Sequence, residues 1–345
     1  MKNIADLSAQ DIARRIKETD FSGAISLAPL GAGPSLDLAF GFADRANRIP
    51  NNIETRFGMA SGSKIFTAIA VGLLIQDGKI ELGTRLADCV RSRQFHFGSE
   101  VTIAQLLSHT SGVPDYFNEE VQCDFAALWR ARASYSMTSP SDFLPLFENE
   151  QMLMRPGTRF FYSNSGFVLL GLVIEELTGL DFRDFIADRI FRPCGMNRSG
   201  YFAMDALPEN TAYGYVSRGE GGWRTNIYSV PSIGAPDGGA FTTVGDLRLF
   251  WTALLAARVL SREMLERFLS PSVQVTERGE TWHYGYGVWL RTERENWIAS
   301  IEGYDPGAEL ESQVWLSEGV VMTVLSNVQD GASPVFQLLD ETIKS

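Results

Sequence analysis

The amino-acid sequence predicts an α/β (α+β) fold, in which both ends of the chain contribute strands to one antiparallel sheet flanked by helices. A mainly helical lobe is inserted between these two ends. Short apolar runs separated by turn residues occur at 24–43 and return at 284–325, whereas helical periodicity dominates from about 80 to 200. Strands at both ends of the chain must bury their apolar faces in the same core as the helices between them. We therefore expect the two termini to form one sheet.

The first quarter of the chain predicts a helix, a hairpin and a second helix. Charged residues such as Asp11, Arg14 and Lys17 make the start an amphipathic surface helix. The apolar runs 24–29 and 35–43 are separated by glycines and a proline at 31–34, which is typical of a hairpin. Residues 64–76 have the helical period and end before Gly78, a residue suited to the left-handed position that closes helices.

The middle of the chain predicts further helices, and the end predicts strands. Thr102 and Gln105 form a capping box for a helix that ends before Gly112. Helical stretches follow at 141–147, 164–177, 181–191 and 333–343, and strands at 284–290, 297–302 and 313–325, the last with a turn at 317–319. We expect a single unit over 1–345, with a sheet lobe at 1–79 plus 201–345 and a helical lobe at 80–200.

Composition excludes several classes of protein. A net charge of −12 without a basic stripe argues against nucleic acid and anionic membranes as partners. No apolar run reaches the roughly 18 residues of a membrane span. The start lacks the apolar stretch of a secretory signal, so export is not indicated and a cytoplasmic location is expected. The three cysteines and three histidines are scattered, which argues against a disulfide framework and against a metal site.

Ser61 and Lys64 form the first candidate for catalytic chemistry. Residues three apart lie on one helix face, with Cβ atoms about 5–6 Å apart. A serine hydroxyl needs a neighbouring base, and a lysine can be that base when burial or nearby positive charge lowers its pKa from about 10.4. A Ser-x-x-Lys match alone arises by chance in roughly one chain in two or three of this composition, and Ser61 could simply cap the helix.

A second motif, Tyr162 with Asn164, lies between a Pro-Gly turn and a helix. Several sequence segments are similar to motifs of a known family and occur in the same order as in that family: residues 55–67, 106–113, 155–166, 193–196, 238–246 and 284–287. With these motifs the chain resembles the serine β-lactamase and penicillin-binding-protein superfamily, in particular its class C-like and esterase branch. The resemblance implies the β-lactamase/DD-peptidase fold and an acyl-enzyme mechanism that needs no metal or organic cofactor.

The resemblance also implies roles for individual residues. Ser61 is acylated, Lys64 and Tyr162 handle its proton, and Asn164 orients lysine and substrate. Another Tyr-x-Asn, at 116–118, competes with the Tyr162 motif but lacks the Pro-Gly approach and the following helix. His109 ends a predicted helix, where a histidine more often caps or packs, so we do not expect it to be catalytic.

The third family motif, a strand with Lys-Thr-Gly, Lys-Ser-Gly or His-x-Gly, is altered here to Ile301, Glu302 and Gly303. The glycine allows close backbone approach, and by resemblance the backbone N–H groups of Tyr304 and Ser61 form an oxyanion hole. The basic residue is lost, and Glu302 would repel a substrate carboxylate. We therefore predict a serine hydrolase, an esterase or amidase acting on small neutral or cationic substrates.

Two alternatives stay open at this stage. Within the enzymes, the chain could be a D-amino-acid peptidase or a weak β-lactamase. In another class, it could be a non-catalytic ligand-binding or scaffold homologue, because its third motif is altered. A transacylase would use the same nucleophile, and the sequence leaves the oligomeric state open.

Overall fold

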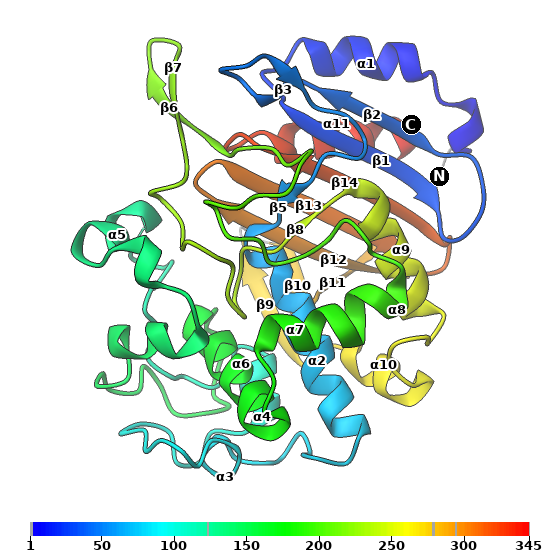
Figure 1. Ribbon diagram of the computed structural model, residues 1–345. Helices are drawn as coiled ribbons and strands as arrows, with labels where there is room; N and C mark the ends of the chain where they lie inside the picture. Colours follow the sequence, from blue (N-terminus) through cyan, green and yellow to red (C-terminus); the bar gives the residue numbers. More distant parts are fainter. Residues whose placement is uncertain (1–2, 123, 278–279, 294, 345) are drawn as a thin grey trace.

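The computed structural model describes residues 3–122, 124–277, 280–293 and 295–344. An eight-stranded antiparallel sheet forms its centre, and strands from both ends of the chain lie side by side in it (Figure 1). The strand order is β2 (Leu36–Phe40), β1 (Gly23–Pro29), β14 (Val320–Ser326), β13 (Ala308–Trp315), β12 (Asn296–Asp305), β11 (Trp289–Glu293), β10 (Glu280–Tyr284) and β9 (Val273–Glu277). The predicted fold class, with one sheet built from both termini, is confirmed.

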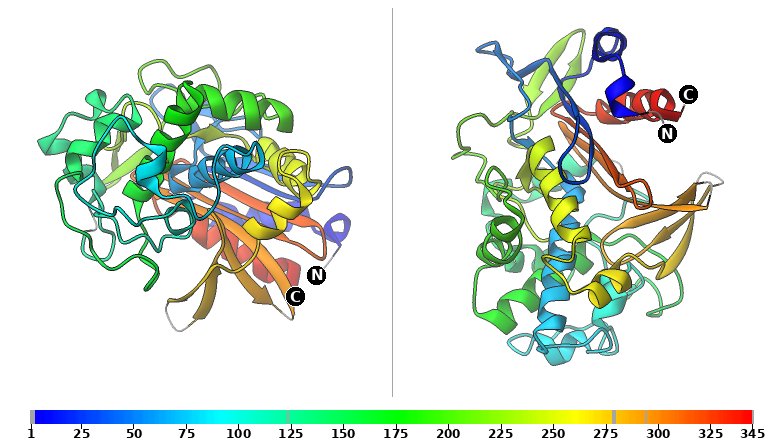
Figure 2. Two further views of the ribbon diagram at one scale, coloured as in Figure 1. Left: turned by 90° about the horizontal axis from the view of Figure 1, so that it is seen from below. Right: turned by 90° about the vertical axis from the view of Figure 1, so that its right-hand side faces the viewer.

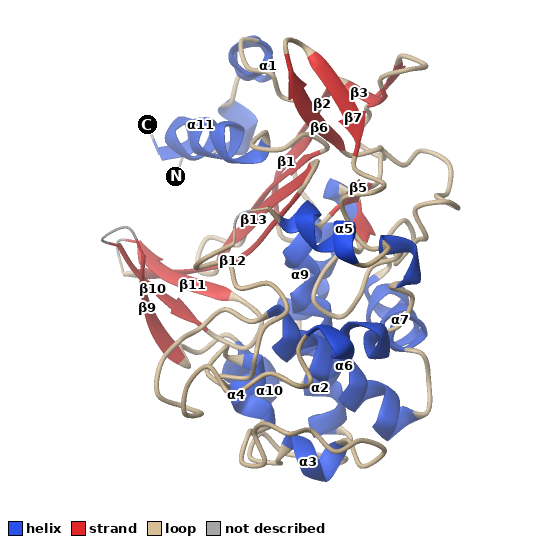
Figure 3. Cartoon of the chain, turned by 90° about the vertical axis from the view of Figure 1, so that its left-hand side faces the viewer, coloured by secondary structure: helices blue, strands red, loops and turns tan. Residues whose placement is uncertain are grey.

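Helices cover the two faces of this sheet. On one face lie α1 (Ala9–Lys17) and α11 (Ala332–Lys344), which Figure 2 shows together at the two chain ends. Alternate strand residues point to opposite faces, so Ile25 and Leu27 of β1 join the core under α1 and α11, whereas Ala24 and Ala28 face the larger core on the other side. Figure 3 shows α2 (Lys64–Gln76) and α9 (Val244–Leu255) on that second side.

The helix α2 (Lys64–Gln76) runs through the middle of the larger core. Its residues from Lys64 to Leu74 are all buried, and it packs against α6 (Asn164–Thr178). An apolar surface all round a helix is typical of a helix buried on every side. Its first residue, Lys64, is therefore enclosed by protein at the point where the helix meets the sheet.

The remaining elements are short. The α-helices are α3 (Leu86–Cys89), α4 (Ile103–Leu107), α5 (Leu128–Ala131), α7 (Phe182–Ile186), α8 (Arg192–Cys194), α9 (Val244–Leu255) and α10 (Arg262–Phe268). The small strand pairs are β3 (Phe42–Asp44) with β4 (Ile49–Pro50), β5 (Phe57–Gly58) with β8 (Phe241–Thr242), and β6 (Tyr215–Gly219) with β7 (Gly222–Thr225). Within the described residues, no helix combines the length and apolarity that crossing a membrane requires.

Two predicted elements differ from the structure. The expected strand at 284–290 is wrong, because Tyr284 ends β10 and Trp289 begins β11, with a tight turn between them. Gly287 takes a φ of +76° there, and a Cβ on it would lie 2.4 Å from Ala68 of α2. The expected helix at 141–147 is a 3₁₀ helix, Pro140–Leu146, with Pro145 inside it. The capping box of Thr102 and Gln105 is confirmed.

Candidate active site

Ser61 lies in a 3₁₀ turn, Ala60–Ser63, that joins β5 to α2. Ala60 takes a left-handed φ of +46°, which few residues other than glycine adopt. The Ser63 hydroxyl donates to the Ala60 carbonyl oxygen at 2.8 Å and accepts from the Ala240 N–H at 3.0 Å. These bonds hold the turn in its strained conformation, and such strain is common at functional sites.

The amine of Lys64 has three fixed partners. Its Nζ lies 2.9 Å from Ser61 Oγ, 2.8 Å from Asn164 Oδ1 and 2.6 Å from the Asp237 carbonyl oxygen. A neutral amine has two N–H groups and one lone pair. Because Asn164 Oδ1 and the Asp237 carbonyl can only accept, they take the two N–H groups and leave the lone pair directed at Ser61 Oγ.

Burial lowers the pKa of Lys64, because the ammonium loses hydration inside the protein. The negative charges of Asp237, Glu119, Asp305 and Asp115 oppose this shift without cancelling it. More of the amine is therefore neutral at a given pH than in a free lysine.

The ring of Tyr162 lies against this amine, with Lys64 Nζ 4.9 Å from the ring centroid. Burial and the charge of Glu119 raise the pKa of Tyr162 well above its ordinary value, although a hydrogen bond with the Ser61 side chain opposes the shift. The phenol therefore keeps its proton at neutral pH. Of the two groups beside Ser61, Lys64 is the better proton acceptor and Tyr162 the better donor.

Asn164 is held in place from three sides. Its Oδ1 accepts from Lys64, its Nδ2 donates to Glu119 Oε1 at 3.2 Å, and its backbone N–H donates to Asp115 Oδ2 at 3.0 Å. The N-cap of α6 is its neighbour Ser163, whose Oγ accepts from the Gly166 N–H at 3.0 Å. The side chain of Asn164 therefore has no capping role and faces the lysine.

His109 holds the backbone on both sides of Tyr162. Its carbonyl oxygen accepts from the Phe161 N–H at 2.7 Å, and its Nδ1 accepts from the Ser163 N–H at 3.0 Å. The imidazole also lies over the Tyr162 ring, with centroids 4.4 Å apart. Burial, together with the charge of Lys64, lowers the pKa of His109 well below its ordinary value, so the imidazole is neutral and packs rather than shuttling protons.

The competing Tyr-x-Asn motif has a different position. The Tyr116 hydroxyl donates to Asp237 Oδ2, and Asn118 Oδ1 accepts from the Glu120 N–H at 3.0 Å. Tyr116 thus contacts Lys64 only indirectly, through the residue whose carbonyl oxygen binds the amine. The structure brings Tyr162 and Asn164, and not the 116–118 motif, into direct contact with Lys64.

The altered third motif lies on β12 against the turn Ala60–Ser63. A Cβ on Gly303 would lie 2.0 Å from the Met59 carbonyl oxygen and 2.6 Å from the Gly62 nitrogen, so only glycine allows this approach. Tyr304 follows it, with its hydroxyl donating to Asp330 Oδ1 at 3.0 Å. Glu302 is exposed and stands opposite Glu311 of β13. Burial is the main cause that raises the pKa of Glu311 to about 7, and the charge of Glu302 adds to it.

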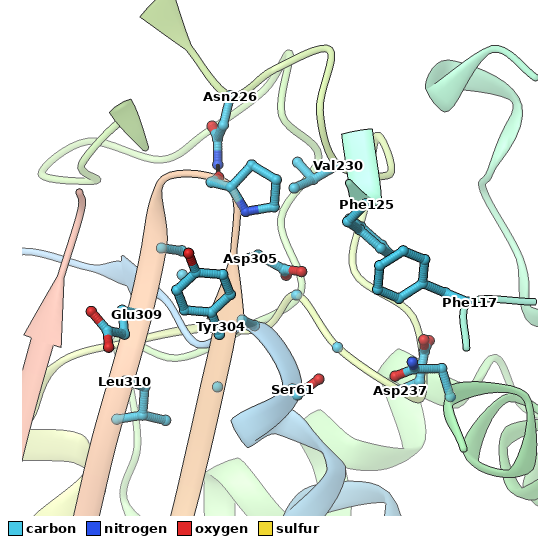
Figure 4. Close-up of a pocket in the computed structure, with 18 of the residues that line it drawn as sticks. Ser61, Phe117, Phe125, Asn226, Val230, Asp237, Tyr304, Asp305, Glu309 and Leu310 are labelled. Carbon is cyan, nitrogen blue, oxygen red and sulfur yellow. Dashed lines mark hydrogen bonds between the residues drawn. The ribbon is translucent and has the colours of Figure 1, made fainter. Parts of the chain in front are cut away.

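A cavity of about 1000 Å³ opens over Ser61 (Figure 4). Residues of all three motifs line it, and so do Phe117, Phe125, Val230 and Trp289 from the connecting loops and β11. In the part of the chain that the structure describes, no group of three or more histidine, cysteine or acidic side chains could hold a metal ion.

Sequence reasoning missed the carboxylates around the amine: Asp115, Glu119, Asp237 and Asp305. Asp237 stands just before a Gly-Gly pair, and Asp305 follows the third motif, but only the fold brings them to Lys64, from 173 and 241 residues along the chain. Burial raises the pKa of Asp115 to about 7, against the hydrogen bonds from Ser165 and Asn164 that lower it.

Comparison with known proteins places the chain in a family. A family model described as Beta-lactamase matches residues 9–341. The chain is 30% identical to penicillin-binding protein 4* of Bacillus subtilis strain 168, over 90% of this chain and 69% of that protein. The crystal structure of a penicillin binding protein from Bacillus halodurans is 39% identical, with a TM-score of 0.90 over 97% of this chain and all of that one.

A more distant structure shows the same fold. The D-amino acid amidase from Ochrobactrum anthropi SV3, complexed with L-phenylalanine amide, has a TM-score of 0.81 at 22% identity, over 97% of this chain and 96% of that one. These matches confirm the resemblance drawn from the sequence motifs and the β-lactamase/DD-peptidase fold. The chain belongs to the beta-lactamase family, within the superfamily of serine β-lactamases and penicillin-binding-protein-like serine hydrolases.

Proposed function

We propose that this protein is a serine hydrolase that forms an acyl-enzyme on Ser61 and cleaves small amides or esters. The observation that carries the proposal is the arrangement at Lys64, whose amine lies 2.9 Å from Ser61 Oγ while two fixed acceptors occupy its N–H groups. Burial that lowers the pKa of the amine completes what a serine nucleophile needs.

Acylation then proceeds in balanced steps. Ser61 Oγ forms a bond to the acyl carbon as its proton passes to neutral Lys64 Nζ, and the carbonyl electron pair moves onto oxygen. When the bond to the leaving group breaks, that group takes a proton from the Tyr162 hydroxyl, which regains one from the Lys64 ammonium. Water then hydrolyses the ester on Ser61 by the reverse sequence of proton transfers.

The negative oxygen that forms during these steps needs donors. The backbone N–H groups of Ser61 and Tyr304 are the proposed oxyanion hole, and one such donor is worth about 10²- to 10³-fold in kcat. The close fit of Gly303 against residues 59–62 supports this role, because it brings β12 to the nucleophile turn.

The charge of the cavity favours neutral or cationic substrates. By the family resemblance, Ile301 stands where the family has a basic residue and Glu302 where it has threonine or serine, and more carboxylates line the same cavity. A substrate carboxylate would be repelled there. This supports an amidase or esterase over an efficient β-lactamase or a carboxypeptidase of D-amino acids.

The intact mass of the protein after incubation with a fluorophosphonate probe tests the proposal. We expect one covalent adduct on the wild type and none on Ser61→Ala. A penicillin, incubated separately, is the second reagent because two relatives carry the name penicillin-binding protein, and we expect it to react slowly or not at all. Absence of any probe adduct on the wild type would favour the non-catalytic scaffold.

Tyr162→Phe and Tyr116→Phe form a matched pair that separates the two Tyr-x-Asn motifs. Tyr162→Phe should lower kcat/KM for an amide about 10²-fold with little change in stability, because a proton donor is lost. Tyr116→Phe should instead lower the free energy of unfolding in urea by about 1–3 kcal/mol, because buried Asp237 loses its donor. The reverse pattern would assign the catalytic phenol to Tyr116.

A further inference from the structure

The cavity over Ser61 is strongly acidic. Its described lining includes one arginine, Arg224, and eight carboxylates: Glu119, Glu120, Asp124, Asp237, Glu302, Asp305, Glu309 and Glu311. The amine of Lys64 lies behind Ser61, where protein oxygens already surround it. The charge of the cavity is thus far from balanced by the protein's own cations.

Seven of these carboxylates already have interaction partners, Glu302 among them. For the other six the partners are Asn164 for Glu119, Arg159 for Glu120, Arg130 for Asp124, Tyr116 for Asp237, and the start of α11 for Glu309 and Glu311. Asp305 differs, because within the described ranges no hydrogen bond or ion pair reaches its carboxylate. Figure 4 shows this carboxylate pointing into the cavity, on the same side as the Ser61 hydroxyl.

The position of Asp305 relates it to the reacting bond. It ends β12 and directly follows Tyr304, whose N–H is a proposed oxyanion donor, and consecutive Cα atoms lie 3.80 Å apart. A substrate carbonyl held by that N–H has its neighbouring carbon atoms beside Asp305. A group attached one or two bonds from the carbonyl carbon is therefore within reach of the carboxylate.

The electrostatics of Asp305 favour a bound cation. Burial, with the charges of Asp237 and Glu119, raises its pKa to about 7 against the opposing effect of Lys64. An anion in this place is unfavourable unless a positive group joins it. A ligand ammonium would form the missing pair.

The wall opposite Asp305 is apolar. Phe117 and Phe125 contact each other edge to face with centroids 5.0 Å apart, and Trp129 supports Phe125 at 5.5 Å. Figure 4 shows both phenylalanines and Val230 across the cavity from Tyr304. A side chain carried on the same carbon as an ammonium group would meet these rings.

We propose that Asp305 binds a primary ammonium group on the acyl part of the substrate, while Phe117 and Phe125 receive an apolar side chain. The substrate is then an amide or ester of an apolar amino acid, or a peptide with a free amino terminus. This inference rests on the proposed function. The ammonium is assigned to the acyl part of the substrate because Asp305 lies next to the proposed oxyanion hole.

Binding to the Ser61→Ala protein tests this assignment without turnover. The ligands are D- and L-phenylalaninamide and their N-acetyl counterparts, with Kd measured by calorimetry. We expect at least one free amine to bind about 10-fold or more tightly than its N-acetyl form. Adding Asp305→Asn should abolish that preference, whereas Asp20→Asn, which removes one exposed charge far from the cavity, should leave it intact.

Each outcome decides the assignment. Equal Kd values for the amine and N-acetyl forms on the Ser61→Ala protein overturn the assignment of Asp305. This comparison uses the Ser61→Ala protein alone, so it does not depend on whether the Asp305→Asn variant folds. A preference that survives Asp305→Asn places the ammonium elsewhere and also overturns it. Failure of the acyl-enzyme proposal shows separately, as a wild type that takes no fluorophosphonate.

Discussion

Replacing Lys64 with methionine is expected to lower kcat/KM for amides and esters by about 10²- to 10⁴-fold, the range that a positioned general base supplies. Methionine has nearly the same length and fills the same buried space, but it has no lone pair on nitrogen to accept the Ser61 proton. Hydrolysis of a chromogenic ester and the rate of fluorophosphonate labelling measure the loss.

Lys64→Arg separates the base from the charge. A guanidinium keeps the positive charge but stays protonated at all accessible pH values, so this variant should fail as completely as Lys64→Met. Lys17→Met, at an exposed lysine of α1, is the control and should keep full activity. An active Lys64→Arg protein would show that the charge, and not proton transfer, is what Ser61 requires.

Gly303→Ala is expected to have the second largest effect, a loss of about 10²- to 10³-fold in kcat/KM. A Cβ would lie 2.0 Å from the Met59 carbonyl oxygen, a backbone atom that cannot move aside as a flexible side chain would. Strand β12 must therefore shift away from the turn at Ser61, and the Tyr304 N–H leaves the position where the oxyanion forms. Overpacking of this kind also costs about 1–3 kcal/mol of stability.

Gly83→Ala is the matched control, because a Cβ there meets nothing within 4 Å. Its activity and stability should equal those of the wild type. Steady-state kinetics and urea unfolding of both variants give the comparison. Wild-type kcat/KM in Gly303→Ala would remove the oxyanion role from the Gly303–Tyr304 segment.

The sequence carries most information where contacts are local. Ser61 and Lys64 are three residues apart, and Thr102 caps a helix through Gln105, so spacing alone places each pair. The strand error at 284–290 has the opposite cause. The turn at Gly287 lies closely against α2, where a Cβ on Gly287 would meet Ala68. Residues 284–290 alone do not reveal this contact.

The electrostatics of the site could not be read from the sequence. Asp237 and Lys64 lie 173 residues apart, and no spacing rule joins them. The family resemblance supplied Tyr162 and Asn164 as candidates, but only the structure shows that Tyr116 binds Asp237 instead of the amine.

The pairing of β1 with β14 has a consequence for how the protein is made. Gly23 pairs with Ser326, so β1 gains this partner only after β14 has been synthesised, 303 residues later. At about 5–20 residues per second, that delay is roughly 15–60 s. During it, the edge of β1 is open to chaperones, and β12 has not yet closed the site over Ser61. The turn that carries Ser61 is therefore synthesised well before β12, the strand that completes the site beside it.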